Sequence, residues 1–383
     1  MPGRKRACCR SPAAGRGLPS AVSCSRTRCL SSFSKCANNL GAMDARHREV
    51  LIAVIREYID SAEPVGSRAL AKRHMPTVSP ATIRNAMADL EEMGYLSQPH
   101  ASAGRVPTDE AYRFYVDSFP PPSPATVALV EPSARERQDG VDRLMEQTAS
   151  QLSETTHFTG LLLTPPLKHT RLAQLELIPL ENDRVLAVIV TEAGWVTARG
   201  LNLPPHIAPD DLREIGREIT RRVRGRTVQQ VLDDYAAPAD PLDRLRTRVG
   251  ALVEQILDLL RDRTLYVRGA INMLDHPEFL DVAAMRQMLR TFEQKDRLIE
   301  LLSGLSQLGG VRVTIGEENP VPDLQDCTLI TSTYTYRDQV LGILGIVGPR
   351  RMPYPQVISI VGDAAHQVSE RLSRVRRDLY FPS

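Results

Sequence analysis

Residues 67–107 constrain this chain more than any other part of its sequence. A short helical run leads to a turn at 75–77, a longer helical run follows, and a segment of small residues ends at Arg105. A short helix, a turn, a second helix and a hairpin form the order of a winged helix-turn-helix, whose second helix enters the major groove of DNA. The segment therefore predicts a module that reads DNA.

A helix precedes this segment. From Asp44 the apolar residues recur at the three- and four-residue spacing of a buried helical stripe, which stops near residue 60. The sequence Glu63-Pro64 marks the connection that follows. Ser67 is expected to cap the next helix, which runs through His74 with Leu70 on its inner side.

The longer helix has the clearest boundaries. Ser79 is expected at its N-cap with Pro80 at the first helical position, and Gly94 is the expected stop. Its buried stripe should hold Ile83, Ala86, Met87, Leu90 and Met93. The opposite side carries Ala81, Arg84, Asn85 and Ala88.

Residues on the outer sides of these two helices are suited to DNA. Arg and Asn side chains make bidentate contacts to guanine and adenine edges, and hydroxyls at a helix start can reach phosphates. Residues 95–108 should form the hairpin wing, with Gly104 at unusual backbone angles and Arg105 at a basic tip. The expected contacts to DNA are Arg68, Lys72, Arg73, Ser79, Thr82, Arg84, Asn85 and Arg105.

A helix-turn-helix pattern can also be a plain three-helix core. Residues 43–117 hold nine Lys or Arg and eleven acids, so this domain is not basic as a whole. Within 67–105 the balance turns to five basic residues and three acids. Positive charge thus gathers on the parts expected to face a groove, which favours DNA binding.

Three runs in this domain resemble the HrcA family of bacterial heat-inducible transcription repressors. They are Glu-Pro-Val-Gly-Ser-Arg at 63–68, Ser-Pro-Ala-Thr-Ile-Arg-Asn-Ala-Met-Ala-Asp-Leu-Glu at 79–91, and Ser-Ala-Gly-Arg-Val-Pro-Thr at 102–108. Gly-Glu-Glu-Asn at 316–319 and Leu-Gly-Ile-Val-Gly-Pro at 344–349 extend the likeness. It covers essentially residues 43–383.

The resemblance implies an α+β protein. A winged helix-turn-helix domain at 43–118 and a Pro-rich linker at 119–125 would precede a GAF-like α+β domain at 126–383, with an inserted helical dimerising region at about 205–265. It also implies a homodimer that represses chaperone operons by binding the CIRCE inverted repeat on double-stranded DNA. A GroEL-type chaperonin would keep this repressor active until heat diverts the chaperonin to unfolded proteins.

Composition indicates a reducing compartment and no membrane partner, and with the predicted DNA binding we expect a cytoplasmic, nucleoid-associated protein. No apolar run approaches a membrane span, and Cys327 is the only cysteine after residue 42. Residues 1–42 hold eight basic residues, no acid and five cysteines without paired Cys-x-x-Cys spacing. They lack a signal-peptide core and have some transit-peptide character. We interpret them as a disordered extension or an upstream start-site artefact, which leaves about −6 of net charge on the rest.

Beyond the linker the pattern alternates between strands and helices. Short β-rich runs at 160–164, 173–180, 184–191 and 195–201 precede a charged helical stretch at 210–260. Helical pattern returns at 280–305, strands at 311–315, 328–336 and 340–347, and a last amphipathic helix at 356–374. This order predicts an α+β domain interrupted by an insertion.

The sequence shows no catalytic or cofactor motif. Cys327 has no assignable base and is interpreted as a core residue, and the histidines lack metal-site spacing, so no metal or cofactor is expected. Neither glycine-rich phosphate-binding motif occurs. Gly342, Gly345 and Gly348 are interpreted as packing positions, Trp195 as strand packing and Asp338 as part of a turn.

A second hypothesis belongs to another class. The GAF-like domain would bind a small metabolite and control the wing, which makes the chain a ligand-gated regulator. An enzyme is disfavoured because its motifs are missing.

Overall fold

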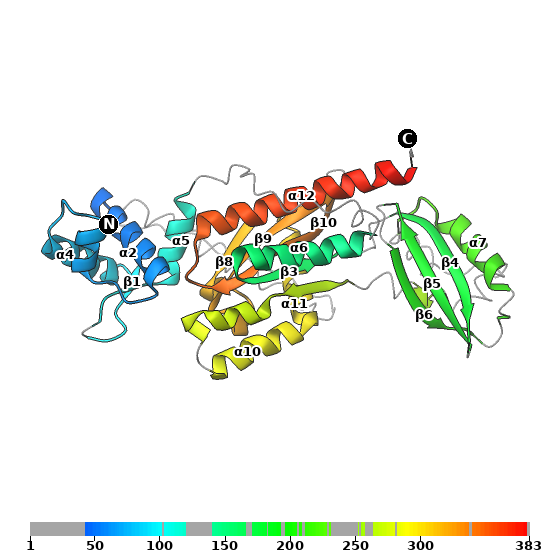
Figure 1. Cartoon of the computed structure of the whole chain (residues 1–383), viewed down its shortest axis with the longest axis horizontal. Coiled ribbons are helices and arrows are strands. Elements are labelled where there is room, and N and C mark those ends of the chain that lie inside the picture. Colours follow the sequence, from blue (N-terminus) through cyan, green and yellow to red (C-terminus); the bar gives the residue numbers. More distant parts are fainter. Residues whose placement is uncertain are drawn as a thin grey trace, which may run out of the picture. The chain divides into compact units, whose positions relative to one another are not determined.

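A computed structural model shows how the 383-residue chain folds (Figure 1). It describes residues 43–101, 103–119, 140–165, 171–181, 183–192, 196–204, 207–208, 211–227, 230, 252, 254–256, 263–279, 282–336 and 339–380. The chain divides into two compact units after Glu49, and the described part of the first holds the start of helix α2 (Ala45–Ser61). There the Asp44 carboxylate caps the helix, accepting a 2.8 Å hydrogen bond from the His47 backbone N–H.

The second unit begins with the winged helix-turn-helix that the sequence predicts. After α2 come α3 (Ser67–Arg73), α4 (Pro80–Glu92), the hairpin of β1 (Leu96–Ser97) and β2 (Val106–Pro107), and α5 (Asp109–Asp117). These elements enclose one apolar core, built by Val50, Leu51, Val54, Ile55, Leu70, Ile83, Met87, Leu90, Leu96 and Tyr112.

Two local predictions in this domain are wrong. Ser67 is the first residue of α3 rather than its cap, because Gly66 holds the N-cap position, and Ser67 is buried. Met93 was expected in the buried stripe but is 43% exposed. Helix α4 ends at Glu92, and Gly94 turns the chain with φ of +85°, so Met93 leaves the helical periodicity.

Helix α5 was not identified from the sequence. Thr108 caps it by accepting a hydrogen bond from the Ala111 N–H at 3.4 Å, and Asp109 and Glu110 occupy its first turn. Acidic residues are favourable there because they face the positive end of the helix dipole. This cap, followed by buried Tyr112 and Tyr115, is the signal that predicts α5.

An antiparallel five-stranded sheet forms the body of the second unit. Its strands are β3 (Thr159–Leu163), β7 (Leu265–Arg268), β8 (Val311–Ile315), β9 (Cys327–Tyr336) and β10 (Gln339–Pro349), in the order β7-β3-β10-β9-β8. Helices α10 (Val282–Glu293) and α11 (Lys295–Ser306) pack on one face. Helices α6 (Gly140–Thr156) and α12 (Tyr354–Tyr380) pack against β3 and β9 (Figure 1).

Short 3-10 helices complete the body at Ala270–Asp275, Pro277–Phe279, Gly316–Glu318 and Pro322–Leu324. The helical stretch expected at 280–305 is two helices, since Gln294 takes a non-helical ψ of 67° between α10 and α11. The later strands and the last helix are confirmed, and the α+β class is confirmed with them. None of the described helices is long and apolar enough to cross a membrane.

A second, three-stranded sheet lies between β3 and β7 in the sequence. It contains β4 (Leu172–Leu180), β5 (Arg184–Thr191) and β6 (Val196–Asn202) in the order β4-β5-β6, and α7 (Leu212–Val223) packs against β4. Strands β3 and β7 pair directly, from Gly160 with Arg268 to Leu163 with Leu265. Residues 164–264 therefore lie between two paired strands of the five-stranded sheet. The dimerising region expected at about 205–265 falls within them and stays a prediction.

The other domain boundaries stay predictions. Residues 1–42, most of the linker at 119–125, Trp195 and Asp338 lie outside the described residues.

Candidate nucleic-acid interface

The start of α4 is built around one hydroxyl. The Ser79 side chain accepts a hydrogen bond from the Thr82 backbone N–H at 3.1 Å, and its Oγ lies 2.8 Å from Thr82 Oγ1. Pro80 at the first helical position needs no hydrogen-bond acceptor there. The remaining N–H groups of the first turn carry the positive end of the helix dipole, which suits a phosphate.

The two faces of α4 separate as the sequence predicts. Ile83, Ala86, Met87 and Leu90 are buried, whereas Ala81, Arg84 and Asn85 are exposed and Ala88 is half-buried. Within the described part of the chain, Arg84 and Asn85 have no hydrogen-bond or ion-pair partner. An exposed guanidinium and an exposed amide on one side of a helix start are free to contact base edges.

Helix α3 contributes two free cations and one paired cation. Arg68 and Lys72 are exposed and form no ion pair with any described residue. Arg73 Nη1 lies 2.5 Å from Glu57 Oε1, and His74 Nε2 lies 2.9 Å from Glu57 Oε2. The Glu57 carboxylate is buried and needs such partners, so Arg73 joins α3 to α2 while its side chain stays 64% exposed.

The wing is a short hairpin with a closed loop. Leu96 pairs with Pro107 and Ser97 with Val106. Gln98 Nε2 donates hydrogen bonds to the carbonyl oxygens of Ala101 and Ala103 at 3.0 and 2.9 Å. The side-chain amide of Gln98 therefore stabilises the loop by binding two of its backbone carbonyl oxygens.

Arg105 does not lie at the tip of the wing. Its backbone N–H and C=O pair with those of Val65 at 2.9 Å, which places it in a bridge next to β2 rather than in the turn that closes the hairpin. Its Nε and Nη2 lie 2.8 and 2.7 Å from Glu91 Oε2, and its side chain is only 18% exposed. The tip position was a wrong prediction, because the sequence does not show that residue 105 pairs with residue 65.

Gly104 is required for a different reason from the one expected. Its φ is not in the left-handed region, but a Cβ there would lie 2.5 Å from the Pro64 and Val65 carbonyl oxygens. Close approach of two backbones, rather than unusual backbone angles, excludes a side chain.

We call Arg68, Lys72, Arg84 and Asn85 the reading face. The expected DNA contacts of all eight residues remain predictions, and the side chains of Arg73, Ser79, Thr82 and Arg105 all take part in internal hydrogen bonds or ion pairs.

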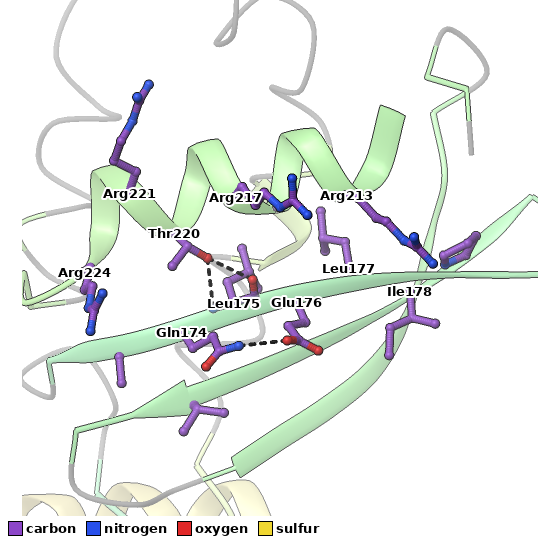
Figure 2. Close-up of a pocket in the computed structure, with 14 residues that line it drawn as sticks. Gln174, Leu175, Glu176, Leu177, Ile178, Arg213, Arg217, Thr220, Arg221 and Arg224 are labelled. Carbon is purple, nitrogen blue, oxygen red and sulfur yellow. Dashed lines mark hydrogen bonds between the residues drawn. The ribbon is translucent and has the colours of Figure 1, made fainter. Parts of the chain in front are cut away.

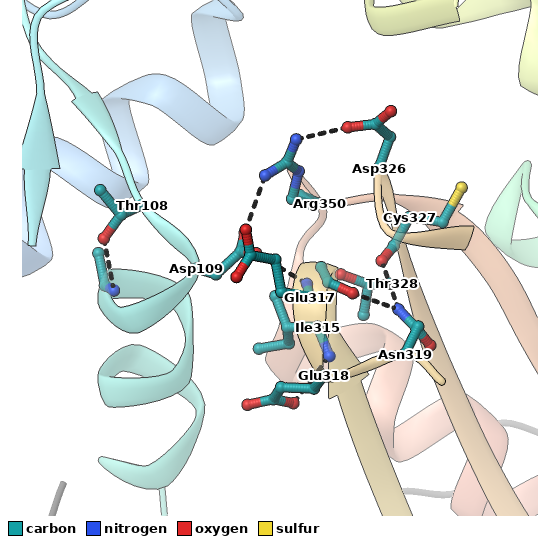
Figure 3. Close-up of polar contacts among 12 residues, drawn as sticks. Thr108, Asp109, Ile315, Glu317, Glu318, Asn319, Asp326, Cys327, Thr328 and Arg350 are labelled. Atoms are coloured by element: carbon teal, nitrogen blue, oxygen red, sulfur yellow. Dashed lines mark hydrogen bonds and ion pairs between the residues drawn. The ribbon is translucent and has the colours of Figure 1, made fainter. Parts of the chain in front are cut away.

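The opposite end of this domain carries a dense polar cluster on α5, which we call the α5 junction (Figure 3). Asp109 Oδ2 accepts a hydrogen bond from the Glu317 backbone N–H at 3.0 Å, and its Oδ1 lies 3.1 Å from Arg350 Nη1. Arg350 also binds Asp326 at 2.7 Å. Arg113 donates to Glu318 Oε1 at 2.8 Å and to the Val313 carbonyl oxygen at 2.7 Å.

The carboxylates in this junction keep its two arginines charged. Burial lowers the pKa of Arg113. Its hydrogen bond and charge contact with Glu318 raise that pKa by more than burial lowers it, so the net shift is upward. Arg350 behaves likewise through Asp109. Both guanidinium groups therefore stay charged despite partial burial.

Gly-Glu-Glu-Asn at 316–319 gives this junction its shape. Gly316 has φ of +52°, and a Cβ there would lie 1.8 Å from Asp109 Oδ2. Asn319 is buried, and its Nδ2 donates to the carbonyl oxygens of Gly316, Leu324 and Cys327 at 3.0–3.1 Å. The motif is thus a turn that presents backbone and carboxylate groups to α5.

The remaining candidates fit structural roles. Burial raises the pKa of the Cys327 thiol to about 12, which makes it a poor nucleophile. A Cβ at Gly342 or Gly345 would lie 2.2–2.4 Å from neighbouring atoms, which agrees with packing positions. Across the described ranges, no three His, Cys, Asp or Glu side chains are grouped to hold a metal ion.

Comparison with known proteins assigns both domains. Residues 42–117 match the family model for the winged helix-turn-helix transcription repressor, HrcA DNA-binding, and residues 142–358 match the HrcA protein C terminal domain. The heat-inducible transcription repressor HrcA of Symbiobacterium thermophilum is 39% identical over 86% of this chain and 98% of its own. That of Geobacter sulfurreducens is 38% identical over 85% and 97%.

One solved structure, described as a hypothetical protein at 2.2 Å resolution, aligns with a TM-score of 0.60 over 87% of this chain and 99% of its own. Its sequence identity of 24% supports the fold alone.

A capped reading helix, a wing and these matches define a winged helix-turn-helix transcription repressor. The chain belongs to the HrcA family.

Proposed function

We propose that this chain represses chaperone operons by binding the CIRCE inverted repeat as a symmetric homodimer. The single observation that carries the proposal is the reading face, where three cations and one amide have no partner among the described residues. The names of the relatives, heat-inducible transcription repressors, supply the class of gene.

A dimer follows from the size of the reading element. One winged helix contacts few base pairs, so one copy discriminates poorly within a genome. Two copies related by a two-fold axis match an inverted repeat, and their linkage raises the effective concentration of the second contact.

The three-stranded sheet offers a surface for that dimer. Its cross-strand register puts Ile178 opposite Leu186, and Val190 opposite Val196, on the same face. Ile178 is 42% and Val196 48% exposed. An apolar sheet face of this kind is typical of an interface between subunits.

We further propose that a GroEL-type chaperonin maintains the active repressor and that heat relieves repression by occupying the chaperonin. This step rests on family membership alone. The same membership favours a non-enzymatic protein that works in the cytoplasm at the nucleoid.

The test is operator binding by the purified full chain. We expect protection of both half-sites in a footprint, and a loss of about 100-fold or more in affinity when one half-site is scrambled. Added chaperonin should increase the fraction of chain that binds after mild heating. Equal affinity for intact, half-scrambled and random duplexes would overturn the proposal.

A further inference from the structure

A pocket of about 990 Å³ lies between strand β4 and helix α7 (Figure 2). One wall is β4, with Gln174, Glu176 and Ile178 on its outer face, and Val190 of β5 stands beside them. The other wall is one side of α7. Pockets of several hundred cubic ångströms with mixed polar and apolar walls are the usual size for small ligands.

Four arginines line this pocket: Arg213, Arg217, Arg221 and Arg224. In Figure 2 the side chains of Arg213 and Arg224 reach toward β4 at opposite ends of the helix, whereas Arg221 points away from the strand. Glu176 is the only carboxylate among the lining residues, and it accepts a 2.8 Å hydrogen bond from Gln174. The pocket is therefore strongly cationic.

Helix stability explains Arg221 and Arg224, which lie at the C-terminal end of α7 where cations are favourable, but it does not explain Arg213 and Arg217. Arg221 pairs with Glu218, but Arg213, Arg217 and Arg224 form no ion pair with any residue that the structure describes. Arg213 lies in the first turn of α7, where a cation faces the positive end of the helix dipole. Arg213 and Arg217 are four residues apart, a spacing at which like charges repel.

The pocket wall is preformed and excludes one class of partner. Thr220 Oγ1 accepts from the Leu175 N–H at 3.1 Å and donates to the Leu175 carbonyl oxygen at 2.9 Å. Because α7 occupies this edge of β4, an added peptide strand cannot pair with it.

We propose that this pocket binds a small organic polyanion. Its phosphate or carboxylate groups contact Arg213, Arg217 and Arg224, since guanidinium forks bind both kinds of anion in two-point fashion. The site belongs to the inserted three-stranded sheet rather than the five-stranded sheet, and it goes beyond operator binding without depending on it.

The experiment titrates the full-length protein with pyrophosphate, citrate and ATP by calorimetry, with adenosine as an uncharged control. We expect at least one anion to bind once per chain with a Kd of about 1 mM or tighter. The anion that binds distinguishes phosphate from carboxylate recognition. Arg213→Gln/Arg217→Gln should weaken that binding about tenfold or more.

Arg312→Gln is the matched control, because Arg312 is an exposed arginine on β8. It should leave anion affinity unchanged. Without ligand the double variant should melt at the same temperature as the parent or higher, since a like-charge pair is removed. Operator affinity measured without anion should also be unchanged, which separates this test from that of the repressor function.

Three outcomes overturn the proposal. One is the absence of binding by all three anions, and another is an equal loss of affinity in Arg312→Gln. The third is that the double variant retains anion binding but dissociates the dimer or weakens binding to random duplex DNA. In that case the arginines serve a second copy of the chain or the DNA backbone.

Discussion

The reading face and the α5 junction use arginine in opposite ways. On α3 and α4, Arg68 and Arg84 are exposed and have no carboxylate partner among the described residues. At the junction, Arg350 is shared between Asp109 and Asp326 (Figure 3). Arg113 is shared among Glu318, Asp117 and the Val313 carbonyl oxygen, and both arginines are partly buried. Both regions belong to one compact unit of the chain.

The difference separates charge kept for a partner from charge used within the fold. An exposed, unpaired cation gains little from its own protein, and its attraction to phosphate is available to DNA. A partly buried guanidinium between two acceptors is desolvated and held in place, so its removal leaves a carboxylate unpaired. Substitutions at the first region should change DNA binding, and those at the second should change stability.

The largest expected effect is at the junction. Gly316→Ala forces a side chain into a left-handed backbone position and against the Asp109 carboxylate, at a cost of roughly 1–3 kcal/mol in the free energy of unfolding. Urea unfolding measures this loss. Gly304→Ala is the control: Gly304 is exposed in helix α11 with open space around it, so alanine should stabilise by roughly 0.5–1 kcal/mol. Unchanged stability in Gly316→Ala would contradict the role given to the turn.

On the reading face, Asn85→Ala should reduce discrimination between operator and random duplex by about tenfold, the equivalent of one bidentate base contact. Lys72→Ala should weaken binding to both DNAs alike, since a phosphate contact carries no sequence information. Competition binding at fixed salt measures both. Equal losses on the two DNAs for Asn85→Ala would remove it from the base-reading residues.

Arg105 tests whether a partly buried, ion-paired arginine serves the fold or the binding of DNA. If its ion pair with Glu91 is purely internal, Arg105→Gln and Glu91→Gln should each cost roughly 0.5–1 kcal/mol in stability and leave DNA affinity unchanged. If DNA competes for Arg105, Glu91→Gln should tighten binding and Arg105→Gln should weaken it. Opposite signs in the two variants would therefore move Arg105 to the reading face.

The smallest effect is expected at Cys327. Because burial raises its thiol pKa to about 12, above the ordinary value of 9.0, the native fold should protect it from alkylation at neutral pH. The stability linked to the protonated thiol is present below pH 9 and is lost as pH rises toward 12. Mass-spectrometric mapping of alkylated Cys327 across this range, with and without urea, is the measurement. Rapid native labelling at pH 7 would contradict burial.

The sequence predicts the winged helix well because its signals are local. Ser79, Pro80 and Gly94 mark the ends of α4 within a few residues of the groups that they satisfy. The stripe of Ile83, Met87 and Leu90 then fixes which side is buried, and Arg84 and Asn85 follow on the other side.

Contacts between residues that are far apart in the sequence could not be predicted from it. Arg105 pairs with Val65 and Glu91, and Asp109 with Arg350, and no periodicity reports such pairs. The cationic pocket could not be predicted for the same reason, because the sequence shows α7 only as part of a charged helical stretch and does not show that β4 lies beside it. In the sequence, Gly-Glu-Glu-Asn at 316–319 is recognisable only as a likeness to the HrcA family. The contacts of this turn with α5 give the physical reason for these residue types.

The pairing of β3 with β7 has a consequence for how this architecture tolerates change. To the five-stranded sheet, residues 164–264 are one hairpin loop whose ends, Leu163 and Leu265, are held a single strand spacing apart. Loop-closure entropy grows only logarithmically, so lengthening a short turn to this size costs about 3 kcal/mol. The three-stranded sheet can therefore be lengthened, exchanged or removed by evolution while the β-ladder on either side of it keeps its register.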